Sequence, residues 1–284
     1  MSVIVMGTVA LDNIKTTARD RRPGMKIKLC LFILGILLTI NVHAAEITSN
    51  EIFAKTVEVY RNLQTYKADG LIVSNMEIQG MKSSTQTEFN ILLKKPNSFL
   101  ISWKQESSFG KSFSQAGAVW SDGREAKLYI GGINTYSKRE NNKSAIAAAT
   151  GISGGGAYTI PALFFNFLDE KGGYFSSLTD PVIEGIADIN GEPCYVLSSP
   201  TETSRKVTYW ISKESGFILK FARSLELPEG GMDVSSDTMD ALSGMKGFSE
   251  EYHSYISSPA LFDTELQFDL PPGAVYKEDM LGEF

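Results

Sequence analysis

Few residues of this chain have the type and spacing that catalysis or metal binding requires. Beyond residue 44 there is a single histidine, His253, and it lies in the alternating run Glu251 to Tyr255. We expect this histidine to face solvent from a strand. Metal sites need several clustered His, Cys or carboxylate ligands, and none occurs with suitable spacing. The sequence therefore predicts no metal site, no cofactor and no catalytic residue.

Cys194 is the one cysteine beyond the apolar segment near the N-terminus. It lies in PCYVLSS, a run typical of a strand, so we expect a small buried hydrophobe there and not a nucleophile. A lone cysteine also excludes an internal disulfide in this part of the chain. The apolar core must then hold the fold without a covalent cross-link.

Two acidic pairs, Asp169 with Glu170 and Glu250 with Glu251, could support glycosidase chemistry if two carboxylates faced each other across a cleft. Adjacent residues of a strand point to opposite faces, so neither pair qualifies by itself. The cluster Gly154 to Gly156 lacks the GK[ST] ending of a phosphate-binding loop and the strand, turn, helix order of a dinucleotide-binding unit. We expect a hinge there.

The elements that must position side chains are mostly strands. Helical spacing over 49–63, with Ser49 or Asn50 as N-cap, predicts one amphipathic helix. After it the apolar period becomes two, and polar residues alternate with apolar ones, which indicates antiparallel strands with one wet face. The apolar positions of two successive strands are Phe89, Ile91, Leu93 and then Phe99, Ile101, Trp103, joined by a turn at 95–97.

Further strands are expected over 116–121, 127–130, 134–138, 182–189, 194–198, 206–211, 217–225 and 248–256. Turns at 122–123, 131–132 and 190–191 contain glycine, which supplies the positive φ angles that tight turns need. Two more helices are expected, at 144–149 and at 161–168, the second nearly all apolar. The stretch Pro228 to Gly247 has no strand pattern and is longer than most ordered connections, so we expect a mobile loop or lid.

An export signal is predicted at residues 25–44. Lys26 and Lys28 follow Met25, and a twelve-residue apolar run from Leu29 to Ile40 comes next. That run is shorter than the roughly 20 residues of a transmembrane helix. The small residues after it fit cleavage after Ala44, or after Ala45. Residues 1–24 are either a long n-region or the result of a start codon assigned too early, and the pair Arg21-Arg22 leaves twin-arginine export open.

Cleavage would leave residues 45–284 as a single domain with an apolar core. The removed part carries six basic and two acidic residues, so the net charge would change from −6 to −10. An acidic surface argues against a nucleic acid partner. We expect a periplasmic monomer with no transmembrane segment after signal cleavage.

The order of several segments carries a family resemblance. LQTYKADG ends the first helix, EFNILLKKPNSFLISW forms a strand pair, and GEPCYVLSS, TYWISKESGFILKF and LQFDLPPGAVY follow toward the C-terminus. This order resembles a family of predicted periplasmic proteins of unknown function that is similar to the LolA and LolB lipoprotein carriers. The resemblance covers roughly 51–276. It implies a mainly β (α+β) fold, an incomplete antiparallel β-barrel of about eleven strands wrapped around covering helices, with an apolar interior able to take acyl chains.

The leading hypothesis is a periplasmic carrier that binds a lipid or an acylated protein in that interior and is not an enzyme. The residues expected to line the ligand site are Phe89, Ile91, Phe99, Ile101, Trp103, Leu163, Phe164 and Phe167. The alternative for each is a place in a closed core. A second hypothesis is a structural or interaction module of the cell envelope that binds a partner protein and has no cavity. A third is a hydrolase with carboxylates drawn from distant strands.

Overall fold

The computed structural model describes residues 47–78, 80–108, 110, 115–152, 157–168, 175, 178–200, 206–226 and 246–278. The chain from Ile47 onward forms one compact unit. The predicted extension at 1–24 and signal at 25–44 lie outside the described residues. So do the glycines at 154–156, the pair at 169–170, and residues 228–245 of the loop or lid predicted at 228–247. The prediction is wrong for Lys246 and Gly247, which belong to strand β11 (Lys246–Ser257) because they pair with β1 (Thr65–Ile78) and β10 (Ile218–Glu226).

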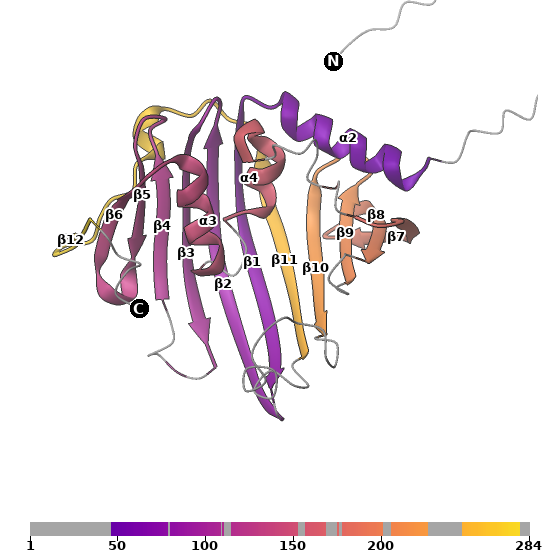
Figure 1. Ribbon diagram of the computed structural model, residues 1–284. Helices are drawn as coiled ribbons and strands as arrows, with labels where there is room; N and C mark the ends of the chain where they lie inside the picture. Colours follow the sequence, from indigo (N-terminus) through magenta and orange to yellow (C-terminus); the bar gives the residue numbers. More distant parts are fainter. Residues whose placement is uncertain are drawn as a thin grey trace, which may run out of the picture. The chain divides into compact units, whose positions relative to one another are not determined.

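Twelve strands form one open sheet in the order β12-β6-β5-β4-β3-β2-β1-β11-β10-β9-β8-β7 (Figure 1). In chain order they are β1 (Thr65–Ile78), β2 (Met81–Lys94), β3 (Ser98–Ser107), β4 (Gln115–Ser121), β5 (Ala126–Ile130), β6 (Thr135–Arg139), β7 (Val182–Ile189), β8 (Glu192–Pro200), β9 (Lys206–Ser212), β10 (Ile218–Glu226), β11 (Lys246–Ser257) and β12 (Val275–Tyr276). Every pairing is antiparallel except β12 with β6. The predicted mainly antiparallel, incomplete barrel is confirmed, with twelve strands where about eleven were expected.

Turn residues fix the hairpins. Asn190 and Gly191 both have positive φ, 55° and 87°, as a two-residue hairpin turn requires, and they join β7 to β8. The turn predicted at Gly131 and Gly132 is instead a short 3-10 helix, η2 (Gly131–Ile133), and the left-handed residue is Asn134. Asparagine tolerates this conformation because its short polar side chain bonds locally.

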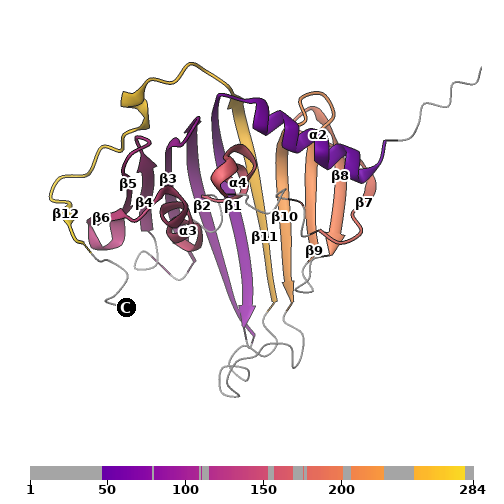
Figure 2. The same cartoon turned by 45° about the horizontal axis from the view of Figure 1, so that its top comes forward.

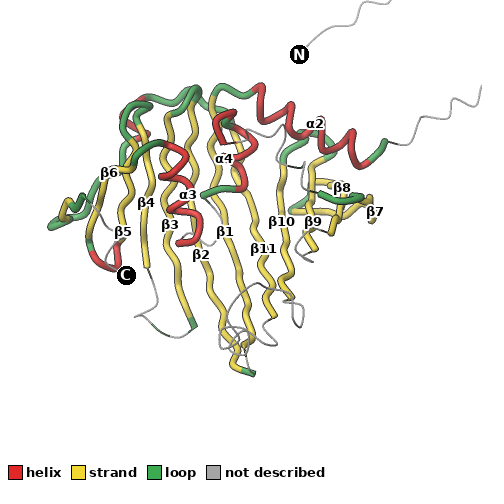
Figure 3. The backbone as a smooth tube through the Cα atoms, viewed as in Figure 1, coloured by secondary structure: helices red, strands yellow, loops and turns green. Residues whose placement is uncertain are grey.

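Three helices lie across one face of the sheet, called here the helix-covered face (Figures 1 and 2). They are α2 (Ser49–Asn62), α3 (Asn142–Ile152) and α4 (Thr159–Phe164), with a 3-10 turn, η3 (Asn166–Leu168), after α4. The helix predicted at 161–168 is thus two pieces, because Phe165 is extended. Figure 3 shows how little of the chain is helical beside the long strands.

The N-cap of α2 is Thr48, one residue before the positions predicted from the sequence. Its hydroxyl accepts the N–H of Glu51 at 3.2 Å, and the Glu51 carboxylate accepts the N–H of Thr48 at 2.8 Å. This reciprocal capping box satisfies two backbone donors at the start of the helix. The apolar stripe of α2 is buried against the sheet, where Phe53 contacts Tyr209 and Tyr60 contacts Tyr66.

The opposite face of the sheet, called here the outer face, is partly covered by the C-terminal segment. The ring of Phe268 lies 5.5 Å from Trp120 and 5.4 Å from Tyr129, measured between ring centroids. This segment includes the 3-10 turn η4 (Asp263–Leu266) and ends in β12, which pairs with β6. Strands β4 and β5 therefore bury side chains on both faces, and so does the end of β2 at Leu92, which packs against Leu261 and Leu266.

Candidate functional site

The helix-covered face of β2 and β3 is a continuous apolar surface. Register pairs its side chains directly across the two strands, as Phe89 with Trp103, Ile91 with Ile101, and Leu93 with Phe99. All six are at most 4% exposed. Direct cross-strand pairs of aromatic and branched side chains pack tightly, so these two strands supply a broad apolar floor.

Helix α4 belongs to the same buried apolar cluster as this floor and lies in front of β1 in Figures 1 and 2. All six of its residues are buried, although the helix is too short to be stable alone. Phe165, which follows α4, contacts Phe99 of the floor with ring centroids 6.1 Å apart and stacks on Phe167 at 4.9 Å. Tertiary packing against the sheet therefore holds this part of the cover in place.

The eight residues predicted to line a ligand site come together in this layer. Seven are 0–4% exposed, namely Phe89, Ile91, Phe99, Ile101, Trp103, Leu163 and Phe164, and the eighth, Phe167, is half-buried against the same cluster. Floor and cover are in contact in this conformation. A ligand that binds between them must displace α4.

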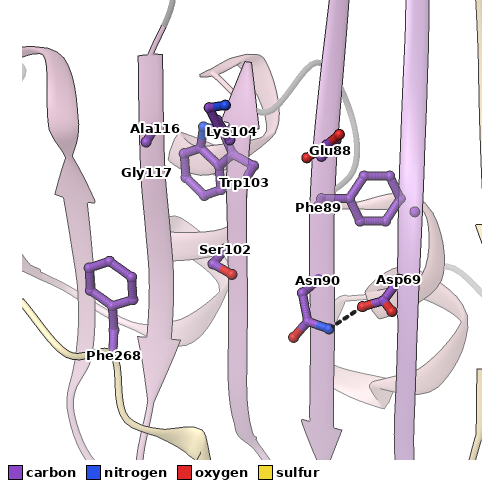
Figure 4. Close-up of a pocket in the computed structure, with 11 residues that line it drawn as sticks. Asp69, Glu88, Phe89, Asn90, Ser102, Trp103, Lys104, Ala116, Gly117 and Phe268 are labelled. Carbon is purple, nitrogen blue, oxygen red and sulfur yellow. Dashed lines mark hydrogen bonds between the residues drawn. The ribbon is translucent and has the colours of Figure 1, made fainter. Parts of the chain in front are cut away.

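Two glycines let the aromatic floor lie flat. A Cβ atom on Gly70 would be 2.0 Å from the Phe89 ring, and one on Gly117 would be 2.3 Å from the Trp103 ring. Each aromatic ring thus occupies the space above its neighbour's backbone, and Figure 4 shows the Trp103 ring turned toward Gly117. Residues with a side chain at these two positions would push the rings out of the layer.

A separate groove of about 470 Å³ lies over the outer face of the same strands (Figure 4). Its walls include the polar side chains of Asp69, Glu88, Asn90 and Lys104, and Phe268 lies at one end. Asn90 donates a hydrogen bond to the Asp69 carboxylate at 2.6 Å. Polar side chains form part of its walls, whereas the side chains of the layer on the other side of the sheet are apolar at Phe89, Ile91 and Trp103.

The expected position of His253 is wrong. The strand was predicted correctly, but His253 is only 3% exposed and lies on the helix-covered face beside Glu251, which is 2% exposed. Nε2 of His253 is 3.0 Å from Oε1 of Glu251, and the imidazole meets the ring of Phe89 edge-on at 5.6 Å. The two residues form a polar pair inside the apolar layer.

A third polar residue joins this pair from the cover. Thr159, at the start of α4, donates a hydrogen bond from Oγ1 to Oε2 of Glu251 at 3.1 Å. The sequence holds one signal for the arrangement, which is the spacing of two between Glu251 and His253. That spacing places both side chains on one strand face, but nothing local shows that the face is buried.

Tyr60 of α2 and Tyr66 of β1 place two further hydroxyl groups in the layer. Burial raises the pKa of both phenols, and the charge of Glu251 adds to the rise. The Tyr60 hydroxyl accepts the N–H of Ile218 at 3.2 Å. Both phenols therefore stay neutral at physiological pH.

Cys194 is buried, as predicted. Burial, together with the negative charges of Glu192 and Asp188, raises the pKa of its thiol to about 11. The thiolate is the nucleophilic form of cysteine, so this side chain has no nucleophilic character near neutral pH.

Within the described ranges no group of three or more His, Cys, Asp or Glu residues is arranged to hold a metal ion. In the same part of the chain, none of the helices has the length and hydropathy needed to cross a bilayer.

Residues 49–232 match the sequence family described as "Predicted periplasmic protein (DUF2092)". This span is more than half of the chain. The chain belongs to this family. The expected membership in a family of predicted periplasmic proteins is confirmed, and no curated protein matches the chain.

Several solved structures are similar to this DUF2092 protein. An uncharacterized conserved protein from Thermus thermophilus is 11% identical, with 81% of this chain and 98% of that one covered and a TM-score of 0.42. The lipoprotein LppX of Mycobacterium tuberculosis is 10% identical, with 75% and 99% covered and a TM-score of 0.40. A LolA superfamily protein from Nitrosomonas europaea is 13% identical, with 78% and 99% covered and a TM-score of 0.30.

Proposed function

We propose that this protein is a periplasmic carrier that binds the acyl chain of a lipid or of an acylated protein between the sheet and helix α4. The observation that carries the proposal is the apolar layer itself, in which paired side chains of β2 and β3 form one buried cluster with a six-residue helix whose residues are all buried. Displacing one short helix exposes a large apolar surface. An acyl chain can cover that surface in place of the helix.

Export through the segment 25–44 is part of this proposal. Protein isolated from the periplasm would then begin at Ala45, or at Glu46 if cleavage follows Ala45. N-terminal sequencing tests this directly, and a mature protein that still begins at Met1 or Met25 would contradict it. The same sample is suited to native mass spectrometry followed by organic extraction and lipid analysis.

Quenching of tryptophan fluorescence tests where in the protein the acyl chain binds. The protein has three tryptophans, and only Trp103 belongs to the apolar layer, whereas Trp120 packs against the C-terminal segment and Trp210 lies beside Lys220. In the variant Trp120→Phe/Trp210→Phe, we expect a brominated fatty acid to quench the remaining fluorescence. The matched variant Trp103→Phe keeps the two outer tryptophans and should be quenched weakly. Equal quenching of both variants would overturn the proposed location.

The edge strand β7 favours a second candidate function, a cell-envelope module that binds a partner protein. Val182, Ile183 and Ile186 of this strand are 54%, 38% and 61% exposed, and no strand pairs with the outer side of β7 among the described residues. An exposed apolar edge can take an added strand from a partner. A protein that purifies without lipid and does not take up a fluorescent fatty acid would favour this alternative.

A further inference from the structure

Thr159 and Glu251 connect the cover to the floor through a polar contact in apolar surroundings. Thr159 is 3% exposed and Glu251 is 2% exposed. The cross-strand neighbours of Glu251 are Ile72 of β1 and Phe221 of β10, and both are buried. The hydroxyl of Thr159 is thus an aliphatic alcohol bound to a carboxylate inside the layer that the proposed ligand would enter.

The polar pair has hydrogen-bonding capacity that the described residues do not use. Oε1 of Glu251 and both ring nitrogens of His253 are buried without a hydrogen-bond partner among those residues. Nε2 is close to Oε1 at 3.0 Å, but the contact lacks hydrogen-bond geometry. Buried polar atoms are nearly always hydrogen-bonded. Unused hydrogen-bonding capacity inside the apolar layer indicates a place where a polar group of a ligand can bind.

We propose that the Glu251–His253 pair binds the hydroxyl group of an uncharged lipid, which takes the place of the Thr159 hydroxyl when α4 is displaced. This proposal rests on the proposed function, since it concerns the same layer. Displacement of α4 breaks the Thr159 hydrogen bond and leaves Glu251 with an unsatisfied oxygen, which is costly in apolar surroundings. A ligand that donates a hydrogen bond restores the lost interaction, whereas a bare hydrocarbon chain does not.

The chemistry of the pair defines the ligand class. A hydroxyl group can donate to the Glu251 carboxylate and accept from a protonated ring nitrogen of His253. A carboxylate ligand brings a second negative charge next to Glu251 and is repelled. An ether oxygen can accept but has no proton to donate, so it leaves the carboxylate unsatisfied. Long-chain alcohols and other neutral hydroxylated lipids are therefore the ligands that fit.

Three probes with a sixteen-carbon chain test the proposal on the protein purified from the periplasm and stripped of lipid. Hexadecan-1-ol, 1-methoxyhexadecane and palmitate each compete with the fluorescent dye N-phenyl-1-naphthylamine. We expect the alcohol to bind about tenfold more tightly than the methyl ether, as one hydrogen bond to a charged acceptor allows. We also expect it to bind more tightly than palmitate.

Two variants separate recognition by the pair from the effect of the cover. In Glu251→Met/His253→Phe, an apolar replacement of similar shape, the preference for the alcohol over the ether should fall to about onefold, while circular dichroism shows whether the protein is folded. In Thr159→Val the pair is intact but α4 is held less firmly, so both probes should bind more tightly with the preference unchanged.

The outcomes distinguish the two proposals. If the alcohol and the ether compete equally well in the unsubstituted protein, or if the double variant keeps the preference, hydroxyl recognition is refuted and acyl binding stands. If none of the three probes competes and the dye itself does not bind, the proposed carrier function fails and this inference fails with it.

Discussion

The ring of Phe89 lies directly over the backbone of Gly70, its partner across β1 and β2, so that a Cβ atom at position 70 would be 2.0 Å from the ring Cζ. Gly70→Ala should therefore lower the free energy of unfolding by about 1–3 kcal/mol, the usual cost of overpacking. Urea denaturation measures the change. Gly132→Ala is the matched control, because a Cβ atom there meets nothing within 4 Å. If Gly70→Ala left the free energy of unfolding unchanged, the Phe89 ring would have to have another position available.

The buried pair predicts a non-additive result. Glu251→Met alone should destabilise the protein by roughly 1–3 kcal/mol, because it leaves the buried Thr159 hydroxyl and His253 without a polar partner. Adding His253→Phe should recover most of that loss, since an apolar pair of similar volume is often neutral or stabilising. Chemical denaturation of Glu251→Met, His253→Phe and the double variant gives a double-mutant cycle for the pair. Additive effects would contradict a direct interaction between the two side chains.

The capping box of α2 predicts which residue starts that helix. Thr48→Ala removes the hydroxyl that accepts the N–H of Glu51 and should cost about 1 kcal/mol of stability. Asn50→Ala changes an exposed residue inside the helix and should have little effect. Thermal unfolding compares the two. If Asn50→Ala lowered the stability more than Thr48→Ala, the N-cap would be Asn50, one of the two residues predicted from the sequence.

Asp122 predicts a pH effect on the β4–β5 turn. Its carboxylate accepts the N–H groups of Glu125 and Arg124, and these bonds lower its pKa below the ordinary value of 3.8. The carboxylate therefore stabilises the fold above that ordinary value, and its contribution is lost as the pH falls through the lowered pKa. The substitution Asp122→Asn keeps an acceptor oxygen at this position but removes the titrating group.

We expect the stability advantage of the unsubstituted protein over Asp122→Asn to be present at about pH 6 and to shrink at about pH 3. Urea denaturation at the two pH values measures the difference. A constant difference between the two proteins would show that the charge of Asp122 does not stabilise the turn.

The sequence predicts the strands well where one face is apolar and the other polar. Strand β7 matches its predicted range of 182–189, and the floor residues of β2 and β3 lie on the predicted face. The turn at Asn190 and Gly191 follows from the positive φ that each adopts. In these places local preference and tertiary packing favour the same conformation.

Strand β11 shows why the polar pair could not be predicted. Its residues on the helix-covered face are Gly247, Ser249, Glu251 and His253, whereas Phe248 and Tyr252 point to the outer face. On this strand the polar residues Glu251 and His253 are therefore buried, whereas the apolar Phe248 is exposed. Those two are buried because β1, β10 and α4 surround them, and a local pattern cannot report such distant neighbours.

The two edges of the sheet, β7 and β12, do not pair with each other. In a closed barrel the strand number and stagger fix the diameter, and a larger guest would have to break backbone hydrogen bonds. In this open sheet no ladder joins β7 to β12, so strand number and stagger do not fix its width in that way. For the proposed carrier, this means that a wider apolar layer would not require any of the sheet's ladders to break.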